Sequence, residues 1–490
     1  MKHSFYFFLT FIFLLSVHLL HGQENFEKYF TNATMRIDYS HTGDATTESE
    51  EIVHIYQYGI WAGSIVNLVD TLNYGAYYFK ILDKKSGTLI YSKGFDSYFK
   101  EYQTSTPAIE GKVKTFYESA VLPSPKNKIV FLLEKRDKKN IFHEIFRADI
   151  DPAEGSISKN PAKDPSVRIY DAVISGDPHK KIDIAIIAEG YTEQENQKFK
   201  DDLKRSAEVF FRAEPCKSNK DKFNIRGVFK PSMESGVDEP GAGIFKNTAV
   251  SASFDALGSE RYLLTEDNKA LRDIASHAPY DALYIMVNSN RYGGGGIYNF
   301  YCVYTADNFN STYLMIHEFG HSFFGLADEY YTSSTSYNNF YSPEVEPYEP
   351  NITALKDPAN IKWKHLLSEG IEIPTPWEKT EYDSVDIAWQ KVRGGLNEHI
   401  TTLKKNKAPA EEIAAAKNEY DKRSAARIKE AQEFLQKSRY AGKVGAFEGA
   451  GYATRGLYRG SVNCIMFTQA NYFCPVCQYA MTRMIEWYSK

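Results

Sequence analysis

The chain changes its sequence pattern near residues 151–165, and this change constrains the fold more than any other feature. Before it, short segments rich in β-branched and aromatic residues alternate with turn signals such as residues 84–87. After it, apolar runs typical of buried strands alternate with helices. The pattern predicts two domains, an all-β sandwich over residues 23–160 and a mixed α/β domain over residues 166–490.

The N-terminus has the features of an export signal. Lys2 precedes an apolar run over residues 5–20, which ends near the small residue Gly22. The run is shorter than the roughly 20 residues that a spanning helix needs, and no later segment is long and apolar enough to span a membrane. We expect residues 1–22 to be a cleaved signal peptide. The mature protein would then lie in the periplasm, at the cell surface or in the medium, without stable membrane insertion.

Composition narrows the classes of partner. The formal net charge is −5 over 490 residues, which gives no reason to expect a nucleic-acid partner. The chain holds 35 Tyr and 31 Phe, and such aromatic residues suit the half-buried faces of strands in a sheet-rich extracellular protein.

A stretch within the second domain differs in composition from its surroundings. Over residues 377–441, Ala, Glu, Lys and Arg become frequent, most of all between residues 409 and 438. This pattern predicts a solvent-exposed helical hairpin, with residues 396–405 as its other arm. We interpret it as an insertion without chemistry of its own.

The strongest chemical signal is His317-Glu318-Phe319-Gly320-His321. Histidines four residues apart project from one face of a helix and can bind one metal ion. Glu318 then lies beside the metal as a general base for the attacking water, as in zinc peptidases. Two histidines packed on one helix face would be the structural alternative, but the acidic residues that follow favour a metal site.

A catalytic zinc needs a third protein ligand and leaves one position open. In the metzincin pattern a glycine follows the second histidine by three residues, and the third ligand follows that glycine by three. Here Gly325 stands one residue later, and the same count leads to Asp328. Glu329 is the alternative third ligand because its side chain is longer, and a distant glutamate is the third option.

Further site residues follow from their order in the chain. Met466 is the candidate for the methionine turn that metzincins place beneath the metal. Tyr458 and Arg459 are candidates for contacts to the substrate or the developing oxyanion. We expect an extended substrate to pair with an edge strand over residues 297–305. The glycines at 293–296 would allow a close approach, or form a mobile loop.

Three of the five cysteines lie close together in the sequence. Cys464, Cys474 and Cys477 favour one disulfide between Cys464 and either of the other two, because an exported protein meets oxidising conditions. A second, structural zinc would need a fourth ligand, which the sequence does not identify.

These motifs together resemble the IgA peptidase family of metzincin-like zinc metallopeptidases. The matching residues are the motif at 317–321, Leu-Ala-Asp-Glu-Tyr at 326–330, Asn-Cys-Ile-Met at 463–466 and Phe-Cys-Pro-Val-Cys at 473–477. The resemblance covers roughly residues 167–490, and the β-rich half resembles the N-terminal domain that often precedes such peptidases. It implies one catalytic Zn²⁺ bound by His317, His321 and Asp328, with Glu318 as the base.

The expected function is therefore that of a secreted, zinc-dependent endopeptidase. Its substrate would be a protein or peptide, with immunoglobulin among the candidates, although the resemblance does not establish IgA as the substrate. Two other functions stay open. One is a binding protein, such as an adhesin or glycan-recognition module, on an inactive peptidase fold. The other is a zinc amidase that acts on cell-wall peptides.

Overall fold

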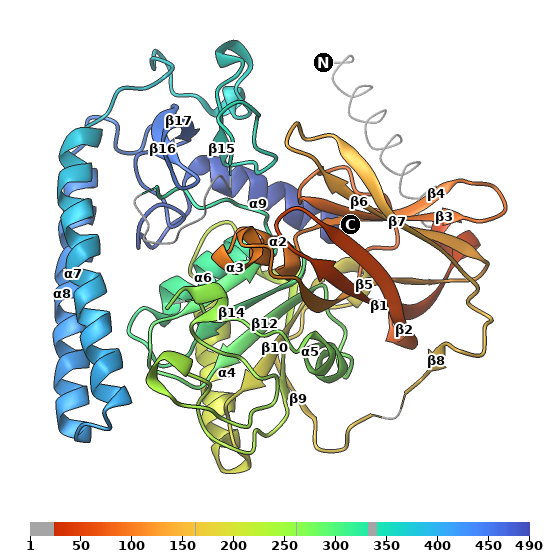
Figure 1. Cartoon of the computed structure of the whole chain (residues 1–490). Helices are drawn as coiled ribbons and strands as arrows, with labels where there is room; N and C mark the ends of the chain where they lie inside the picture. The colour runs from red at the N-terminus through yellow and green to blue at the C-terminus, as the bar shows by residue number, and fades with distance from the viewer. Residues whose placement is uncertain (1–23, 162, 261, 332–340) are drawn as a thin grey trace.

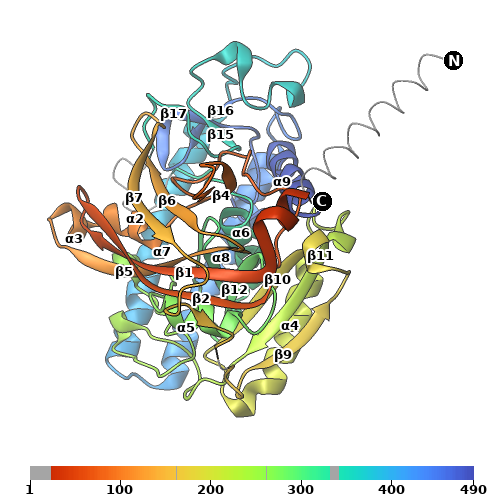
Figure 2. The same ribbon diagram turned by 90° about the vertical axis from the view of Figure 1, so that its right-hand side faces the viewer.

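A computed structural model describes residues 24–161, 163–260, 262–331 and 341–490. The predicted signal peptide lies outside these residues. The described chain forms a strand-rich N-terminal domain and a larger α/β domain, which lie against each other (Figures 1 and 2). None of the described helices combines the length and apolar character needed to cross a membrane.

The N-terminal domain consists of two four-stranded sheets with a shared core. One sheet has the order β5-β1-β2-β8 and the other β4-β3-β6-β7. Their inner faces meet in one cluster, to which β1 contributes Ile37 and β6 contributes Phe131. The strands are β1 (Phe30–Gly43), β2 (Glu48–Ile60), β3 (Tyr77–Asp83), β4 (Leu89–Phe95), β5 (Lys114–Pro125), β6 (Ile129–Arg136), β7 (Phe142–Ile150) and β8 (Ser158–Lys159).

The α/β domain is built on a six-stranded sheet with the order β13-β14-β12-β10-β11-β9. The four inner strands are parallel, and the two edge strands run antiparallel to their neighbours. The bounds are β9 (Arg168–Val173), β10 (Ile182–Glu189), α4 (Asn196–Phe210), β11 (Phe223–Phe229), α5 (Asn268–Ala275), β12 (Ala282–Val287), β13 (Gly294–Ile297), β14 (Tyr301–Thr305) and α6 (Ser311–Ser322).

Both faces of this sheet are buried, which explains why its inner strands are continuous apolar runs. Ile184 and Ile186 of β10 face one core with residues of α4 and α6. Ala185 and Ile187 face the opposite core, which includes residues of α5 and Phe116 of the N-terminal domain. The N-terminal domain therefore covers part of one face of the six-stranded sheet.

The C-terminal third completes the α/β domain. A small sheet of order β15-β17-β16 comprises β15 (Ile352–Thr353), β16 (Phe447–Ala450) and β17 (Ala453–Arg459), and helix α9 (Pro475–Tyr488) follows. The predicted hairpin is formed by α7 (Lys379–Lys405) and α8 (Ala410–Gln436), and it stands on the side away from the sandwich (Figure 1). Helix α7 begins at Lys379, well before the predicted residue 396. The prediction began too late because Gly394 and Gly395 lie inside the helix and weaken its sequence signal.

A buried histidine in the N-terminal domain leads to a prediction about pH. His41 on β1 lies 3.2 Å from Glu118, 3.2 Å from Glu48 and 3.3 Å from Glu50. Burial alone would lower the pKa of His41, but these carboxylates raise it to about 9. Because the folded pKa lies above the unfolded value, the protonated histidine stabilises the fold fully below about pH 6.5 and loses this effect as pH rises through about 9.

We therefore expect His41→Gln to lower stability by up to about 3 kcal/mol near pH 6 and by much less near pH 10. The check is the thermal unfolding midpoint of both proteins across this range. A difference between wild type and variant that does not change with pH would contradict the prediction.

Candidate active site

Helix α6 carries the predicted metal motif and lies directly beneath the edge of the main sheet. Its first turns are apolar, and Leu314, Met315 and Ile316 are buried. This buried stretch anchors the helix in the core that it shares with the sheet. The helix thereby presents His317, Glu318 and His321 at its far end, toward a pocket that they help to line.

The structure brings the two histidines and Asp328 together. The Nε2 atoms of His317 and His321 are 3.1 Å apart, and each lies 3.1 Å from Oδ1 of Asp328. The three side chains form one of the groups whose geometry can hold a metal ion.

Main-chain carbonyls hold the two imidazoles in place. Nδ1 of His317 lies 3.0 Å from the carbonyl oxygen of Ile465, and Nδ1 of His321 lies 2.6 Å from that of Leu326. A carbonyl only accepts, so each Nδ1 donates its hydrogen and each Nε2 faces the cluster, where it can bind a metal ion once it carries no proton. This is the tautomer that a metal ligand requires.

The turn after α6 decides which acidic residue faces the histidines. Gly325 has φ +64°, in the left-handed region that favours glycine, and the chain bends there. After the bend, Asp328 faces the histidines and Glu329 faces a separate cluster with Cys464, Cys474 and Cys477. Glu329 is therefore not placed as a third ligand beside the histidines, because neighbouring side chains of an extended segment point in opposite directions.

The Asp328 carboxylate is held in a fixed orientation beside the histidines. Its Oδ2 accepts a hydrogen bond from the hydroxyl of Tyr452, which leaves Oδ1 toward the two histidines. Burial alone would raise the pKa of Asp328, but His321 and His317 keep that pKa well below its usual range. Burial would lower the pKa of His321, and the Asp328 carboxylate raises it to about 9. The site therefore attracts positive charge.

These three atoms fit a zinc ion. Tetrahedral zinc with bonds of about 2.0–2.1 Å keeps its nitrogen and oxygen ligands roughly 3.3 Å apart. The 3.1 Å separations agree with that value, and two neutral imidazoles with one carboxylate are a donor set typical of catalytic zinc. The three side chains are therefore suited to hold a metal ion.

Two glycines allow α6 to approach the edge strand β13. A Cβ atom at Gly296 would lie 2.4 Å from the main-chain oxygen of Glu318 and 3.0 Å from Cβ of His321. A Cβ atom at Gly294 would lie 2.9 Å from Oε1 of Glu318. Any larger residue would push the strand away from the helix, so these glycines bring the sheet edge to within contact of Glu318.

The edge strand differs from the predicted one. Residues 297–305 do not form a single strand: β13 is the edge, β14 is the next strand inward, and Asn299 with φ 52° lies in the turn between them. The glycine run is thus not a mobile loop, because residues 294–296 are most of the edge strand itself. The sequence hid this because a glycine run has no side chains from which a strand can be predicted.

Replacing Gly296 with alanine is expected to destabilise the protein by about 1–3 kcal/mol, because the methyl group meets the main chain of α6. Activity is expected to fall as well, since Glu318 would be displaced. Thermal unfolding and peptide hydrolysis would measure both effects. Gly394→Ala is the matched control, because a Cβ atom there meets nothing within 4 Å. Equal unfolding midpoints for the two variants would show that the contact does not matter.

Met466 lies beneath the metal motif. It is fully buried, and a Cβ atom at Gly320 would come within 2.8 Å of its sulfur. The main-chain oxygen of Met466 accepts a hydrogen bond of 2.8 Å from the amide of Glu329. The turn around Met466 therefore supports both the helix and the segment that carries Asp328.

Arg459 is buried away from the pocket, whereas Tyr458 is partly exposed. The guanidinium of Arg459 is fully buried, lies 3.8 Å from the ring centre of Phe467 and donates to the carbonyl of Gly449 over 2.7 Å. Neither residue is among the described walls of the pocket. Strand alternation directs Arg459 into the interior, where it packs on Trp377 and Phe467, and leaves Tyr458, which pairs with Thr353, partly exposed.

The pocket has walls that the sequence analysis did not identify. Gly75, Asp96 and Glu101 come from the N-terminal domain, which therefore contributes to the candidate site. Among the residues that the structure describes, eight tyrosines line it: Tyr262, Tyr292, Tyr298, Tyr313, Tyr330, Tyr341, Tyr348 and Tyr452. The high tyrosine content was the available signal, but composition alone does not separate strand-forming tyrosines from those that line a pocket.

A comparison with known protein families matches the part of the chain that carries this site. The model of the IgA Peptidase M64 family matches residues 171–485, which include the whole metal motif, Asp328 and Met466. The chain belongs to the IgA peptidase M64 family. A model of the Peptidase M64 N-terminus matches residues 25–147 of the same chain. A search of curated proteins found no match.

Membership of the M64 family confirms the resemblance and indicates a peptidase. The two M64 matches leave residues 148–170 between them, where the sequence pattern changes.

Proposed function

We propose that this M64 protein is an exported, zinc-dependent endopeptidase that hydrolyses peptide bonds in protein substrates. The observation that carries the proposal is the convergence of His317, His321 and Asp328 at 3.1 Å separations in the wall of a pocket, beside Glu318. A zinc ion bound there would act as a Lewis acid, polarising the scissile carbonyl and making water a stronger nucleophile at neutral pH.

The chain's own residues account for the proton transfers. Glu318 follows the first ligand directly, so its carboxylate lies beside the cluster in the pocket wall. There it can accept a proton from the attacking water and pass it to the leaving amine. Tyr452 keeps Asp328 oriented by donating to Oδ2. The main-chain oxygens of Ile465 and Leu326 do the same for the imidazoles.

The edge strand β13 is the proposed binding site for the substrate backbone. The oxygen of Gly294 already accepts a hydrogen bond from the amide of Leu263 on the outer side of the sheet. Gly296, two residues on, faces the same side and is the one partly exposed residue of the strand. An extended peptide can therefore pair with Gly296 and bring its scissile bond next to Glu318.

Removal and restoration of zinc test the proposal. A chelator is expected to abolish cleavage of a proteome-derived peptide library, and added Zn²⁺ is expected to restore it, because the three ligands leave a coordination position open to water. Immunoglobulins in the same assay test one candidate substrate class. Failure to cleave any protein or library peptide by zinc-loaded protein would contradict the proposed function.

Export is part of the proposal because it follows from the N-terminal residues 1–22, which lie outside the described structure. Expression with and without this segment, followed by N-terminal sequencing of the mature protein, tests it. Cleavage near Gly22 is the expected result.

A further inference from the structure

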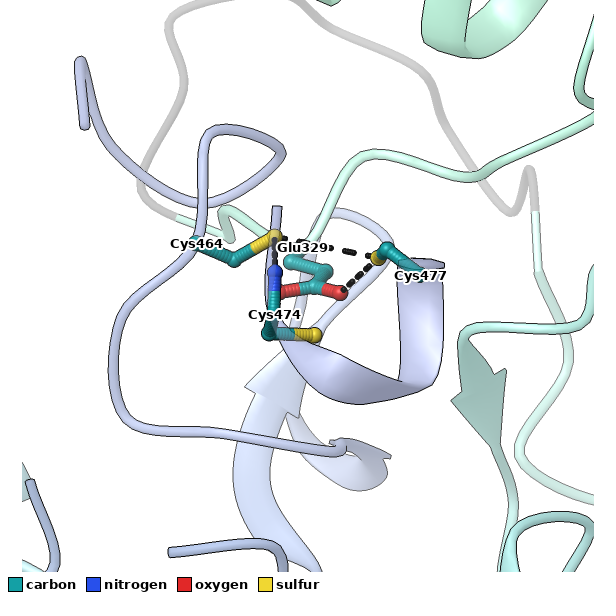
Figure 3. Close-up of side chains that lie close together, drawn as sticks. All are labelled: Glu329, Cys464, Cys474 and Cys477. Carbon is teal, nitrogen blue, oxygen red and sulfur yellow. Dashed lines mark hydrogen bonds between the residues drawn. The ribbon is translucent and has the colours of Figure 1, made fainter. Parts of the chain in front are cut away.

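A second cluster of metal-binding side chains lies behind the first. Glu329, Cys464, Cys474 and Cys477 each offer a ligand atom, and these atoms all lie within 4.8 Å of one another. All four residues are fully buried. Figure 3 shows the three sulfurs and the carboxylate gathered around a common point. Three separate chain segments supply them: the segment after α6, the turn before Met466 and the start of α9.

The distances fit a tetrahedral metal ion better than a disulfide. The sulfurs of Cys464 and Cys477 are 3.7 Å apart, and Oε1 of Glu329 lies 3.3 Å from the sulfur of Cys477. Zinc–sulfur bonds of about 2.3 Å in a tetrahedral site place two sulfurs roughly 3.8 Å apart, whereas a disulfide requires about 2.0 Å. The expected disulfide is not formed in the structure, in which all five cysteines are free.

Glu329 is the observation that points to a ligand. Its side chain has no solvent exposure, and among the residues that the structure describes its Oε2 has no hydrogen-bond partner. The amide of Asn351 donates to its other oxygen, Oε1, over 3.1 Å. Burying a carboxylate with an oxygen that lacks a hydrogen-bond partner costs free energy of folding, and a bound cation offsets that cost. Glu329 is thus the candidate for the fourth ligand that the sequence did not identify.

We propose that Glu329, Cys464, Cys474 and Cys477 bind a structural zinc ion, separate from the catalytic metal. Four protein ligands in a closed, buried site are typical of structural zinc, whereas catalytic zinc keeps an open position. The ion would connect segments about 140 residues apart in the chain. The proposal does not depend on peptidase activity.

The position of this site gives it a second role. Glu329 follows the ligand Asp328 directly. Cys464 precedes Ile465, whose carbonyl oxygen holds His317, and lies two residues before Met466. The structural zinc would therefore fix both segments that orient the catalytic ligands. Glu329 and the three cysteines are positioning residues, because they contact no substrate.

Metal analysis of the purified full chain tests the proposal. We expect two zinc ions per chain in the wild type, and one in His321→Ala and in Cys474→Ser. Replacement of zinc by Co²⁺ is expected to produce the intense sulfur-to-cobalt charge-transfer absorption of thiolate ligation. That absorption should persist in His321→Ala and disappear in Cys474→Ser.

Further variants separate ligation from folding. Glu329→Cys supplies a fourth thiolate, so it should keep both zinc ions and strengthen the charge-transfer band. Glu329→Gln should weaken binding of the second ion while it preserves shape. Cys216→Ser is the matched control, because it removes a buried thiol outside the cluster and should keep both ions.

Several outcomes would overturn the proposal. These are one zinc per chain in the wild type without thiolate-to-cobalt absorption, iron in place of the second zinc, or a disulfide from Cys464 found by mass spectrometry. Failure of the proposed function is distinguishable, because it would appear as two zinc ions per chain without any peptide hydrolysis.

Discussion

Glu318→Gln is expected to lower kcat by about 10²–10⁴-fold, because glutamine cannot accept a proton from the attacking water. The substitution keeps the size of the side chain, so the contact with the edge strand at Gly294 should remain. The two histidines and Asp328 are unchanged, and we expect the zinc content to equal that of the wild type. Steady-state hydrolysis of a cleaved peptide, together with metal analysis, would measure both effects.

The zinc content decides how a loss of activity in Glu318→Gln is interpreted. An inactive variant with full zinc content identifies Glu318 as the base, whereas loss of zinc would show that the substitution disturbs the site. Full activity with full zinc would exclude Glu318 from the chemistry. That last result would also weaken the proposal of an endopeptidase. Glu318 is the acidic residue of the pocket wall that directly follows His317 on α6, and the proposed mechanism has no other base.

Asp328→Ala is expected to remove the third ligand and abolish zinc-dependent hydrolysis. The two remaining imidazoles would bind zinc without the carboxylate that now lies 3.1 Å from each Nε2. The loss should exceed that of Tyr452→Phe, which removes only the hydrogen bond to Oδ2. Loss of a hydrogen bond that orients a metal ligand typically lowers metal affinity by about 10- to 100-fold.

Zinc titration with a competing chelator would measure the affinities of the Asp328→Ala and Tyr452→Phe variants. The order wild type, Tyr452→Phe, Asp328→Ala is the expected ranking from tightest to weakest binding. Equal affinities for Asp328→Ala and wild type would show that the third ligand is another residue. Cys216→Ser serves as the control, because it removes a buried thiol that belongs to neither metal-binding group.

The sequence by itself determined the features that depend on short spacing. Two histidines four residues apart on a helix must share a face, so the location of the metal motif required no fold. The change from strands to strand–helix alternation near residue 151 likewise predicted a β-rich domain followed by an α/β domain, and the structure and the family matches agree with this order. Local periodicity and local spacing are properties of the chain alone.

Only the tertiary structure decided between residues that the sequence left equivalent. Asp328 and Glu329 are neighbours with similar chemistry, and the bend at Gly325 sends one toward the histidines and the other toward the cysteines. The hydrogen bond between Asp328 and Tyr452 joins residues 124 positions apart, and the contact of His317 with Ile465 joins residues 148 apart.

The contribution of the N-terminal domain to the pocket and the burial of Arg459 also depend on distant segments meeting. Such contacts follow from how sheets and helices pack, because spacing along the chain does not encode which distant side chains share a space. The physical reason is the same for the cysteine cluster: its fourth ligand lies more than 130 residues before the other three, so only folding could identify it.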